Sequence, residues 1–200
     1  METIRGRKSL ELDFYGLMDR LANYNRIILD LGTGDGRYVR TLAEECPNSL
    51  IIGVDSCREN LREYSQAKLQ NMLFIIASAQ SLPKELNGLI SQITINFPWG
   101  SLLESLLIDD SKLMRGLESL SRLNTSMDVR LNSGALAEAG TTLEAGAEKI
   151  YSNLIRSGWQ IESPVLINAN ALRSFPTTWA KRLAFGRDPR AILLSGTCAK

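Results

Sequence analysis

The stretch 26–45, "RIILDLGTGDGRYVRTLAEE", determines the fold class of this 200-residue chain. Ile27 to Leu31 is an apolar, β-branched run that ends in glycines, and apolar side chains recur with helical period after Gly36. Strand, glycine-rich turn and helix therefore follow one another, as they do in an open α/β sheet. Because such sheets bind ligands at the carboxyl ends of their strands, the turn is a candidate binding loop.

The rest of the chain continues this alternation of strands and helices. Further predicted strands are 49–56, 72–79, 91–97, 126–132, 159–168 and 190–197, and predicted helices are 13–25, 58–70, 111–123 and 143–159. The pattern predicts a doubly wound, mostly parallel, seven-stranded sheet with helices on both faces. The last two strands lack a long helix between them, which indicates an antiparallel hairpin at one edge. That ending is typical of the class I S-adenosylmethionine-dependent methyltransferase fold.

Length and composition favour one domain covering residues 1–200. Residues 1–13 predict a β-hairpin extension, and 133–146, rich in Gly, Ala and Thr, predict a mobile connection. There is no histidine, and the three cysteines lack metal-type spacing, so we expect no metal site and no Ser–His triad. Because the chain has no apolar run of about 20 residues, we expect no membrane span. We expect a location in the reducing cytoplasm. We also expect a monomer.

The charge is nearly balanced, with 23 basic and 22 acidic residues, so the net charge of the chain does not indicate a nucleic-acid binder. Its distribution is less even, since residues 171–200 carry six basic side chains and one acidic one. Such a segment is either a solvated basic edge or a surface that faces a phosphate backbone.

The glycine-rich turn favours S-adenosylmethionine over a dinucleotide as its ligand. Its spacing is G-x-G-x-G, and Asp35 inside it is unfavourable beside a pyrophosphate but favourable near a sulfonium or an ammonium group. Asp55 ends the next strand about 20 residues later, where a carboxylate accepts protons from ribose hydroxyls. The predicted cofactor-binding residues are Asp30, Gly32, Thr33, Gly34, Asp35, Gly36, Arg37, Asp55, Ser56, Ala79, Gln80 and Asn96. Gln80 either contacts the adenine ring or begins a helix.

A second motif, "NFPWGSLLE" at 96–104, begins at the end of the fourth predicted strand of the sheet. It resembles the Asn-Pro-Pro-aromatic motif of amino-group methyltransferases, with Phe97 in place of the first proline. Together with "DLGTGDGR" at 30–37 and "TWAKRLAFGR" at 178–187, it resembles the aminoglycoside-resistance methyltransferases that act on 16S rRNA. The resemblance covers nearly the whole chain. Those enzymes methylate N1 of a decoding-site adenine and so block kanamycin and apramycin.

The resemblance implies roles for particular residues. Trp99 and Trp179 would sandwich a flipped adenine, while Phe97 and Pro98 would shape the wall of the pocket. The RNA-facing segment would be 171–190, with RNA-binding residues Thr177, Lys181, Arg182 and Arg187. The partner would be the 16S rRNA of the small ribosomal subunit, and the product of the donor would be S-adenosylhomocysteine. Since N1 of neutral adenine carries a free lone pair, the reaction needs positioning rather than a general base.

Two other interpretations stay open at this point. Asn96 before Phe-Pro-Trp also fits a methyltransferase that acts on another ring nitrogen or amino group, in tRNA, a small molecule or a protein. The segments 62–71 and 130–149, where the resembling enzymes carry lysine-rich docking surfaces, hold few basic residues. A catalytically silent homologue that binds RNA or the cofactor is therefore the third interpretation.

Overall fold

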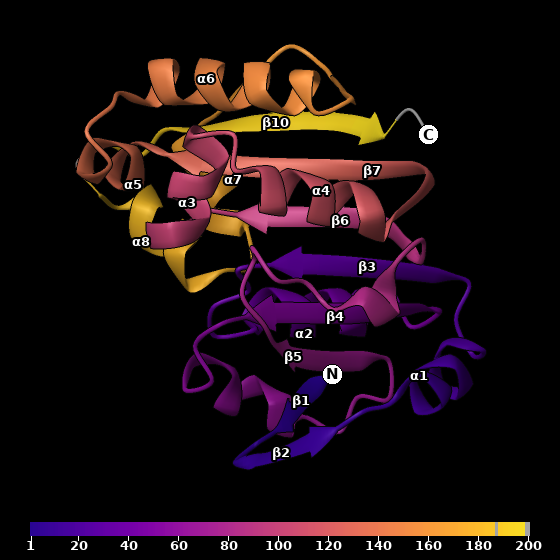
Figure 1. The fold of residues 1–200 in the computed structure, drawn as a ribbon. Coiled ribbons are helices and arrows are strands. Elements are labelled where there is room, and N and C mark those ends of the chain that lie inside the picture. Colours follow the sequence, from indigo (N-terminus) through magenta and orange to yellow (C-terminus); the bar gives the residue numbers. More distant parts are fainter. Residues whose placement is uncertain (187, 199–200) are drawn as a thin grey trace.

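The glycine-rich stretch forms the predicted strand–loop–helix unit in the computed structural model, which describes residues 1–186 and 188–198. Strand β3 (Arg26–Leu31) lies in the middle of the sheet, and helix α2 (Arg37–Glu45) follows the loop. The parallel strands that surround β3 are β5 (Met72–Ile76), β4 (Ser49–Asp55), β6 (Ile90–Asn96) and β7 (Ser121–Asn132), in the spatial order β5-β4-β3-β6-β7. Their carboxyl ends meet at one edge of the sheet (Figure 1).

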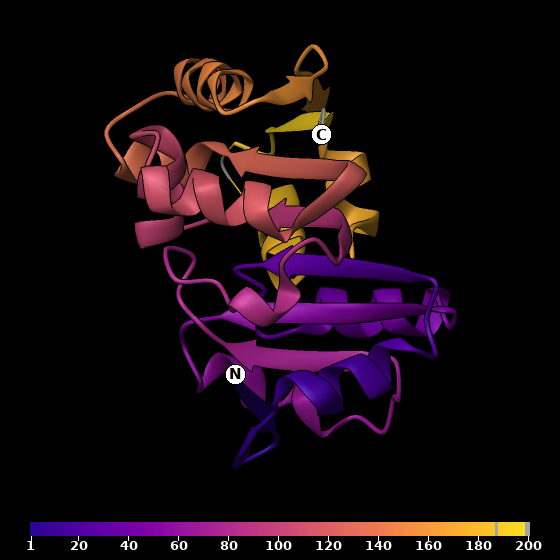
Figure 2. The same cartoon turned by 45° about the vertical axis from the view of Figure 1, so that its right-hand side comes forward.

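Antiparallel strands flank this parallel core on both sides. On one side are β10 (Ala191–Cys198), which pairs with β7, and β8 (Trp159–Ile161) and β9 (Val165–Ile167), which both pair with β10. On the other side is the predicted N-terminal hairpin, β1 (Glu2–Arg5) and β2 (Lys8–Glu11), whose Thr3 pairs with Ile75 of β5. Figure 2 shows the hairpin at the edge remote from β10.

Within the described residues the sheet has ten strands, three more than the seven predicted. Two of the extra strands come from the N-terminal hairpin, which joins the sheet instead of standing apart from it. The third arises because the predicted strand 159–168 is split into β8 and β9, with Pro164 between them. Proline has no backbone N–H to donate to the ladder, so the pairing with β10 is interrupted there. The parallel core and the antiparallel edge confirm the predicted fold class.

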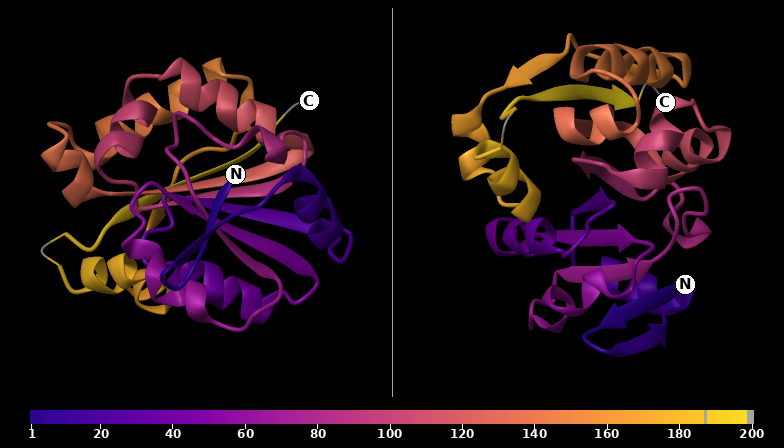
Figure 3. Two further views of the ribbon diagram at one scale, coloured as in Figure 1. Left: turned by 60° about the horizontal axis from the view of Figure 1, so that its bottom comes forward. Right: turned by 90° about the vertical axis from the view of Figure 1, so that its left-hand side faces the viewer.

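Helices cover both faces of the sheet (Figure 3). One face packs against α1 (Phe14–Leu21), α3 (Gly100–Leu107), α4 (Ser111–Leu120), α5 (Ser133–Glu138) and α6 (Leu143–Arg156). The opposite face packs against α2 and against α7 (Ala169–Ser174) and α8 (Thr178–Ala184). Successive residues of β3 alternate between the two faces: Leu29 and Leu31 join the larger core, and Ile28 joins the core under α2.

The segments 58–70 and 133–146 differ from the sequence-based expectation, and residues 121–123, predicted as helix, belong to β7. The helix predicted at 58–70 is only two short 3₁₀ turns, Asn60–Arg62 and Tyr64–Gln66, because Ser65 accepts a hydrogen bond from Gly6 N (2.8 Å) and so ties the segment to the hairpin. The stretch 133–146 contains helix α5, capped by the side chain of Asn132 on Ala135 N. Its mobility stays a prediction. A further 3₁₀ turn, Lys84–Leu86, precedes β6, and no helix among the described residues is long and apolar enough to cross a membrane.

Because of the backbone at Gly36, we expect that adding a single methyl group there greatly lowers the free energy of unfolding. Gly36 has φ of 80°, and a Cβ there would lie 2.6 Å from Cε1 of the buried Phe74. Gly88 has a similar φ of 71°, but a Cβ there would meet nothing within 4 Å. We expect Gly88→Ala to lower the free energy of unfolding by about 1 kcal/mol, from backbone strain alone. Gly36→Ala should lower it by about 2–4 kcal/mol because overpacking adds to the strain.

Urea unfolding of the two variants measures this difference, and the shared left-handed backbone makes Gly88→Ala a matched control. Equal losses in both variants would show that the contact with Phe74 relaxes without cost.

Candidate active site

A cavity of about 490 Å³, here called the donor cavity, lies at the carboxyl ends of β3, β4 and β6. Ten of the twelve predicted cofactor-binding residues line it: Asp30, Gly32, Thr33, Gly34, Asp35, Asp55, Ser56, Ala79, Gln80 and Asn96. The other two do not. Gly36 packs against Phe74, and Arg37 Nε donates to the hydroxyl of Tyr64 (3.0 Å). The volume lies within the range of about 300–1,000 Å³ that is usual for sites of small molecules.

The loop after β3 is shaped to pass close to a ligand. Gly34 has φ of 58°, its N–H donates to Asp55 Oδ2 (2.9 Å), and a Cβ there would meet no protein atom within 4 Å. A side chain at this position would therefore extend into open space beside the loop, where a ligand would otherwise approach. Asp55 Oδ1 accepts from Cys57 N (2.8 Å), so the carboxylate is held at the end of β4. Its remaining lone pairs suit the two hydroxyls of a ribose.

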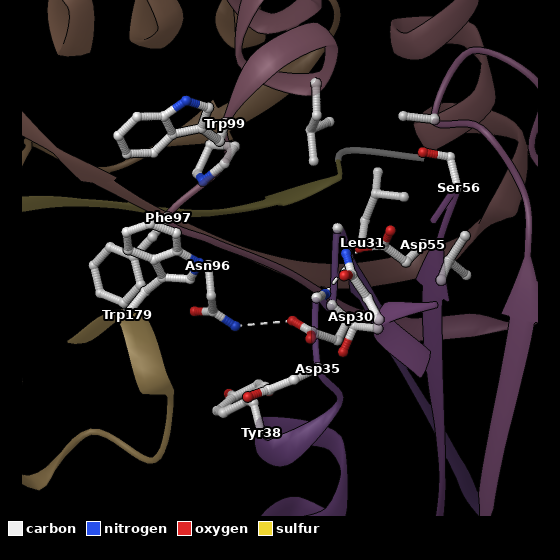
Figure 4. A pocket seen from close by; sticks show the side chains of 18 of the residues that line it. Asp30, Leu31, Asp35, Tyr38, Asp55, Ser56, Asn96, Phe97, Trp99 and Trp179 are labelled. Atoms are coloured by element: carbon white, nitrogen blue, oxygen red, sulfur yellow. Dashed lines mark hydrogen bonds between the residues drawn. The ribbon is translucent and has the colours of Figure 1, made fainter. Parts of the chain in front are cut away.

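Asp30 is a buried carboxylate at the end of β3, with 2% of its surface exposed. Its Oδ1 accepts from Thr94 Oγ1 and from Asn96 Nδ2, both at 2.8 Å, and Figure 4 shows the second of these bonds. Burial raises the pKa of Asp30 to about 6, against the opposing effects of these hydrogen bonds and of the charge on Arg130. A poorly solvated carboxylate of this kind favours a cationic ligand. The methionine part of S-adenosylmethionine, with its sulfonium and ammonium, meets that requirement.

Arg130, on β7, was not predicted from the sequence, and it controls the orientation of Asn96. Its Nη1 donates to Asn96 Oδ1 (3.1 Å), and its Nη2 donates to Asp128 (3.0 Å). Both ends of the Asn96 amide are thus engaged, the oxygen by Arg130 and the nitrogen by Asp30. The guanidinium also lies 4.8 Å from the ring centre of Phe175, just before α8. A cation near the end of the strand beside β6 was the only sequence signal that could have identified it.

The four residues predicted around the target base, Phe97, Pro98, Trp99 and Trp179, all line the same cavity. Trp99 and Trp179, here called the base platform, are stacked on each other with ring centres 5.3 Å apart and planes 23° apart. They are 39% and 45% exposed, which is unusual for tryptophan and typical of a binding surface. The Trp99 indole N–H donates to Glu138 (3.2 Å), and the Arg182 guanidinium lies 5.4 Å from the Trp179 ring centre.

Of the predicted RNA-binding residues, Thr177 and Arg182 line the cavity, and Lys181 is exposed on α8 outside the lining. Arg187 lies outside the described residues. The Thr177 hydroxyl caps α8 by accepting from Ala180 N (2.9 Å). Its neighbour Thr178, which the sequence did not single out, reaches across to Asp35 instead. Within residues 1–186 and 188–198, no group of three or more acidic or cysteine side chains is placed to hold a metal ion.

Comparison with known proteins identifies the family of this site. The family described as "NpmA: 16S rRNA (adenine(1408)-N(1))-methyltransferase" matches residues 2–198. The chain belongs to this methyltransferase family. A relative from Escherichia coli, named 16S rRNA (adenine(1408)-N(1))-methyltransferase, is 32% identical over 218 aligned positions that cover all of both chains.

Solved structures agree with the family. The structure of the 16S rRNA methyltransferase KamB is 27% identical, with a TM-score of 0.89 and full coverage of both chains. A structure described as that of an antibiotic-related methyltransferase is 31% identical, with a TM-score of 0.85 and coverage of 98% and 99%. This chain is thus a methyltransferase, and its methyl donor is S-adenosylmethionine.

Because the pKa of Asp30 is raised, we expect the stability of this methyltransferase to depend on pH. Its pKa is about 6 in the folded protein, against 3.8 for an ordinary Asp side chain. Its contribution to stability is therefore complete below pH about 4 and is lost as the pH rises through about 6. We expect Asp30→Asn, which stays neutral, to gain up to about 3 kcal/mol relative to wild type between pH 4 and pH 7.5. Urea unfolding at several pH values measures the difference, and parallel curves would contradict it.

The same group predicts the pH dependence of donor binding. Because a cationic ligand favours the ionised carboxylate, the affinity of the wild-type protein for S-adenosylmethionine should rise as the pH increases through about 6. In Asp30→Asn the affinity should be lower and nearly independent of pH in this range. Calorimetry between pH 5 and pH 8 tests this, with Asp55→Asn as the control variant, whose affinity should fall without losing the rise at pH about 6.

Proposed function

We propose that this protein methylates N1 of the decoding-site adenine in the 16S rRNA of the small ribosomal subunit and thereby confers resistance to aminoglycosides. The names of its relatives specify adenine 1408 and position N1. The observation that carries the proposal is the base platform, two partly exposed indoles stacked at the donor cavity. A nucleobase that stacks between them lies beside the donor.

The platform suits a base that has left its helix. Stacking on an aromatic side chain contributes about 1–3 kcal/mol per base, which offsets the few kcal/mol needed to flip an adenine out. At 5.3 Å between ring centres, the indoles leave no room for a third ring. They must therefore separate as the base enters, and the contact between them is exchanged for two contacts with the base.

The chemistry requires the protein to position rather than to transfer protons. The donor supplies a methyl group on a positively charged sulfur, and N1 of adenine offers a free lone pair. Burial raises the pKa of Tyr38 to about 12, so its hydroxyl stays neutral and does not act as a base near pH 7. Asp30, Asp35 and Asp55 hold the donor from one side, and the base platform aligns the acceptor from the other.

Asn96 and Phe97 favour a ring nitrogen over an exocyclic amino group as the acceptor. In the amino-group motif a polar side-chain oxygen orients the amine, whereas Arg130 already donates to the oxygen of Asn96. Phe97 has φ of 54°, which a proline ring cannot adopt. The loop therefore departs from the Asn-Pro-Pro-aromatic pattern in conformation as well as in sequence. Both features support methylation at N1.

The C-terminal segment supplies the RNA-facing charge. Lys181 and Arg182 both lie on α8, and Arg182 is next to Trp179 of the base platform, whereas Arg190 is paired with Asp188 and Glu144 and is not free for phosphates. We infer that the enzyme acts as a monomer on small subunits in the cytoplasm, with no metal ion. The sparse basic residues in 62–71 imply that a few contacts near the flipped base carry much of the binding.

We expect that removing either indole reduces methyl transfer without weakening donor binding. Trp99→Ala and Trp179→Ala should each reduce methylation of small subunits by about 10–100-fold, because one stacking surface is worth about 1–3 kcal/mol. The affinity for S-adenosylmethionine should change less than about threefold. Trp99→Phe and Trp179→Phe, which retain a ring, serve as controls and should retain most of the activity.

Primer extension across the decoding site measures the modification, and kanamycin and apramycin susceptibility of an expressing bacterium measures the resistance. A wild-type enzyme that binds the donor but leaves no stop at the adenine would refute the RNA assignment. Transfer of labelled methyl to tRNA, protein or small molecules in the same experiment would identify the other substrate class, and no transfer at all would identify a silent homologue.

A further inference from the structure

Helix α8 and the loop after β3 are joined by a hydrogen bond between residues 143 positions apart in the chain. The Thr178 hydroxyl donates to Asp35 Oδ2 at 2.7 Å. Both residues are partly buried and line the donor cavity. A hydroxyl that donates to an ionised carboxylate makes one of the stronger hydrogen bonds in proteins. This contact therefore attaches the segment that carries Trp179 directly to the loop that faces the donor.

The two adjacent threonines have separate roles. Thr177 Oγ1 accepts from Ala180 N (2.9 Å) and caps α8, which accounts for its place in the sequence without any ligand. Thr178 is the first residue of α8, and its hydroxyl is not needed for the cap. Its hydroxyl donates to Asp35 instead, and it is the direct chain neighbour of Trp179. Any displacement of Thr178 moves one indole of the base platform.

Asp35 receives this hydrogen bond in a fixed orientation. Its Oδ1 accepts from Arg37 N (3.0 Å), so Oδ2 remains for Thr178 and for the cavity. The flanking Gly34 and Gly36 both have positive φ, and the loop conformation therefore sets the direction of the carboxylate. A cationic donor in the cavity and the Thr178 hydroxyl both interact with the same charge. Ordering the carboxylate for one of them orders it for the other.

Apolar contacts hold the rest of the segment independently of Thr178. Phe175 stacks on Tyr38 (5.3 Å, 18°) and meets Phe97 edge-on (5.8 Å, 90°), while Leu172, Ala180 and Ala184 are buried against Phe97 and Ala191. These contacts account for the docking of α7 and α8 on the sheet. None of the residues in these contacts belongs to the loop 32–36 after β3. The hydrogen bond from Thr178 is thus an added connection at the end of α8 nearest the donor.

From this geometry we infer that Thr178 is a positioning residue that couples donor binding to the placement of Trp179. With the donor bound and Asp35 ordered, α8 is held so that Trp179 faces the target base. By thermodynamic reciprocity, a base held by the platform strengthens donor binding by the same factor. The coupling to RNA rests on the proposed function, whereas the link between Thr178 and Asp35 does not.

A double-mutant cycle on the free enzyme tests the link without RNA. Thr178→Val removes the hydroxyl and retains the shape of the side chain, and Thr178→Ser retains the hydroxyl. Calorimetry with S-adenosylhomocysteine should show an affinity about three- to tenfold lower in Thr178→Val, and near wild type in Thr178→Ser. In the Asp35→Asn background, Thr178→Val should have little further effect. Thr177→Val is the neighbouring control, since its loss of the cap should lower thermal stability by the same amount in both backgrounds.

A second measurement tests the coupling to RNA. In wild type and Thr178→Ser, small ribosomal subunits should raise the affinity for S-adenosylhomocysteine about fivefold or more, and Thr178→Val should lose this increase. Additive effects in the cycle, or equal losses in the valine and serine variants, would overturn the inference. If wild type itself neither binds nor methylates small subunits, the proposed function fails, and the cycle on the free enzyme still decides the role of Thr178.

Discussion

The site depends on one buried negative charge, the carboxylate of Asp30 at the end of the central strand. Burial makes this group costly, as the rise of its pKa to about 6 indicates. Its neighbours reduce the cost without neutralising it: Thr94 and Asn96 donate hydrogen bonds from β6, and Arg130 acts from β7 through Asn96. A carboxylate that is held but not paired with a cation leaves that position for the donor.

The same set of contacts reaches the other half of the site. Arg130 orients Asn96 and also lies over Phe175, which packs against Tyr38 of α2 and against Phe97. The residues proposed to face the donor and those proposed to face the base are therefore joined through shared side chains. This arrangement places Phe97 in a strained backbone conformation, with φ of 54°, while 96% of its surface is buried. The turn after β6 directs Trp99 toward α8. A proline at position 97 would prevent this turn, because its ring cannot adopt a positive φ.

The sequence predicted what local patterns determine. The strand–loop–helix unit, Asp55 at the end of the second strand and the antiparallel edge all follow from periodicity and spacing, and resemblance to a family brought Trp99 and Trp179 together. What could not be predicted depends on contacts between distant segments. The helical pattern of 58–70 does not form a long helix, because Ser65 contacts the hairpin. Thr177 and Thr178 cannot be distinguished in the sequence, but in the structure Thr177 caps α8 and Thr178 donates to Asp35.

The absence of histidine from the chain has a consequence for how this enzyme responds to pH. Burial raises the pKa of Tyr38 to about 12, and acceptance of a methyl group by N1 consumes no base, so the acceptor side needs no side chain that changes its charge in the neutral range. The donor side does, because Asp30 changes its charge near pH 6. Under the proposed function, a change of pH therefore affects the binding of the cationic donor and not the methyl transfer itself. A site that only positions its reactants can therefore depend on pH through the carboxylate that is proposed to hold the donor.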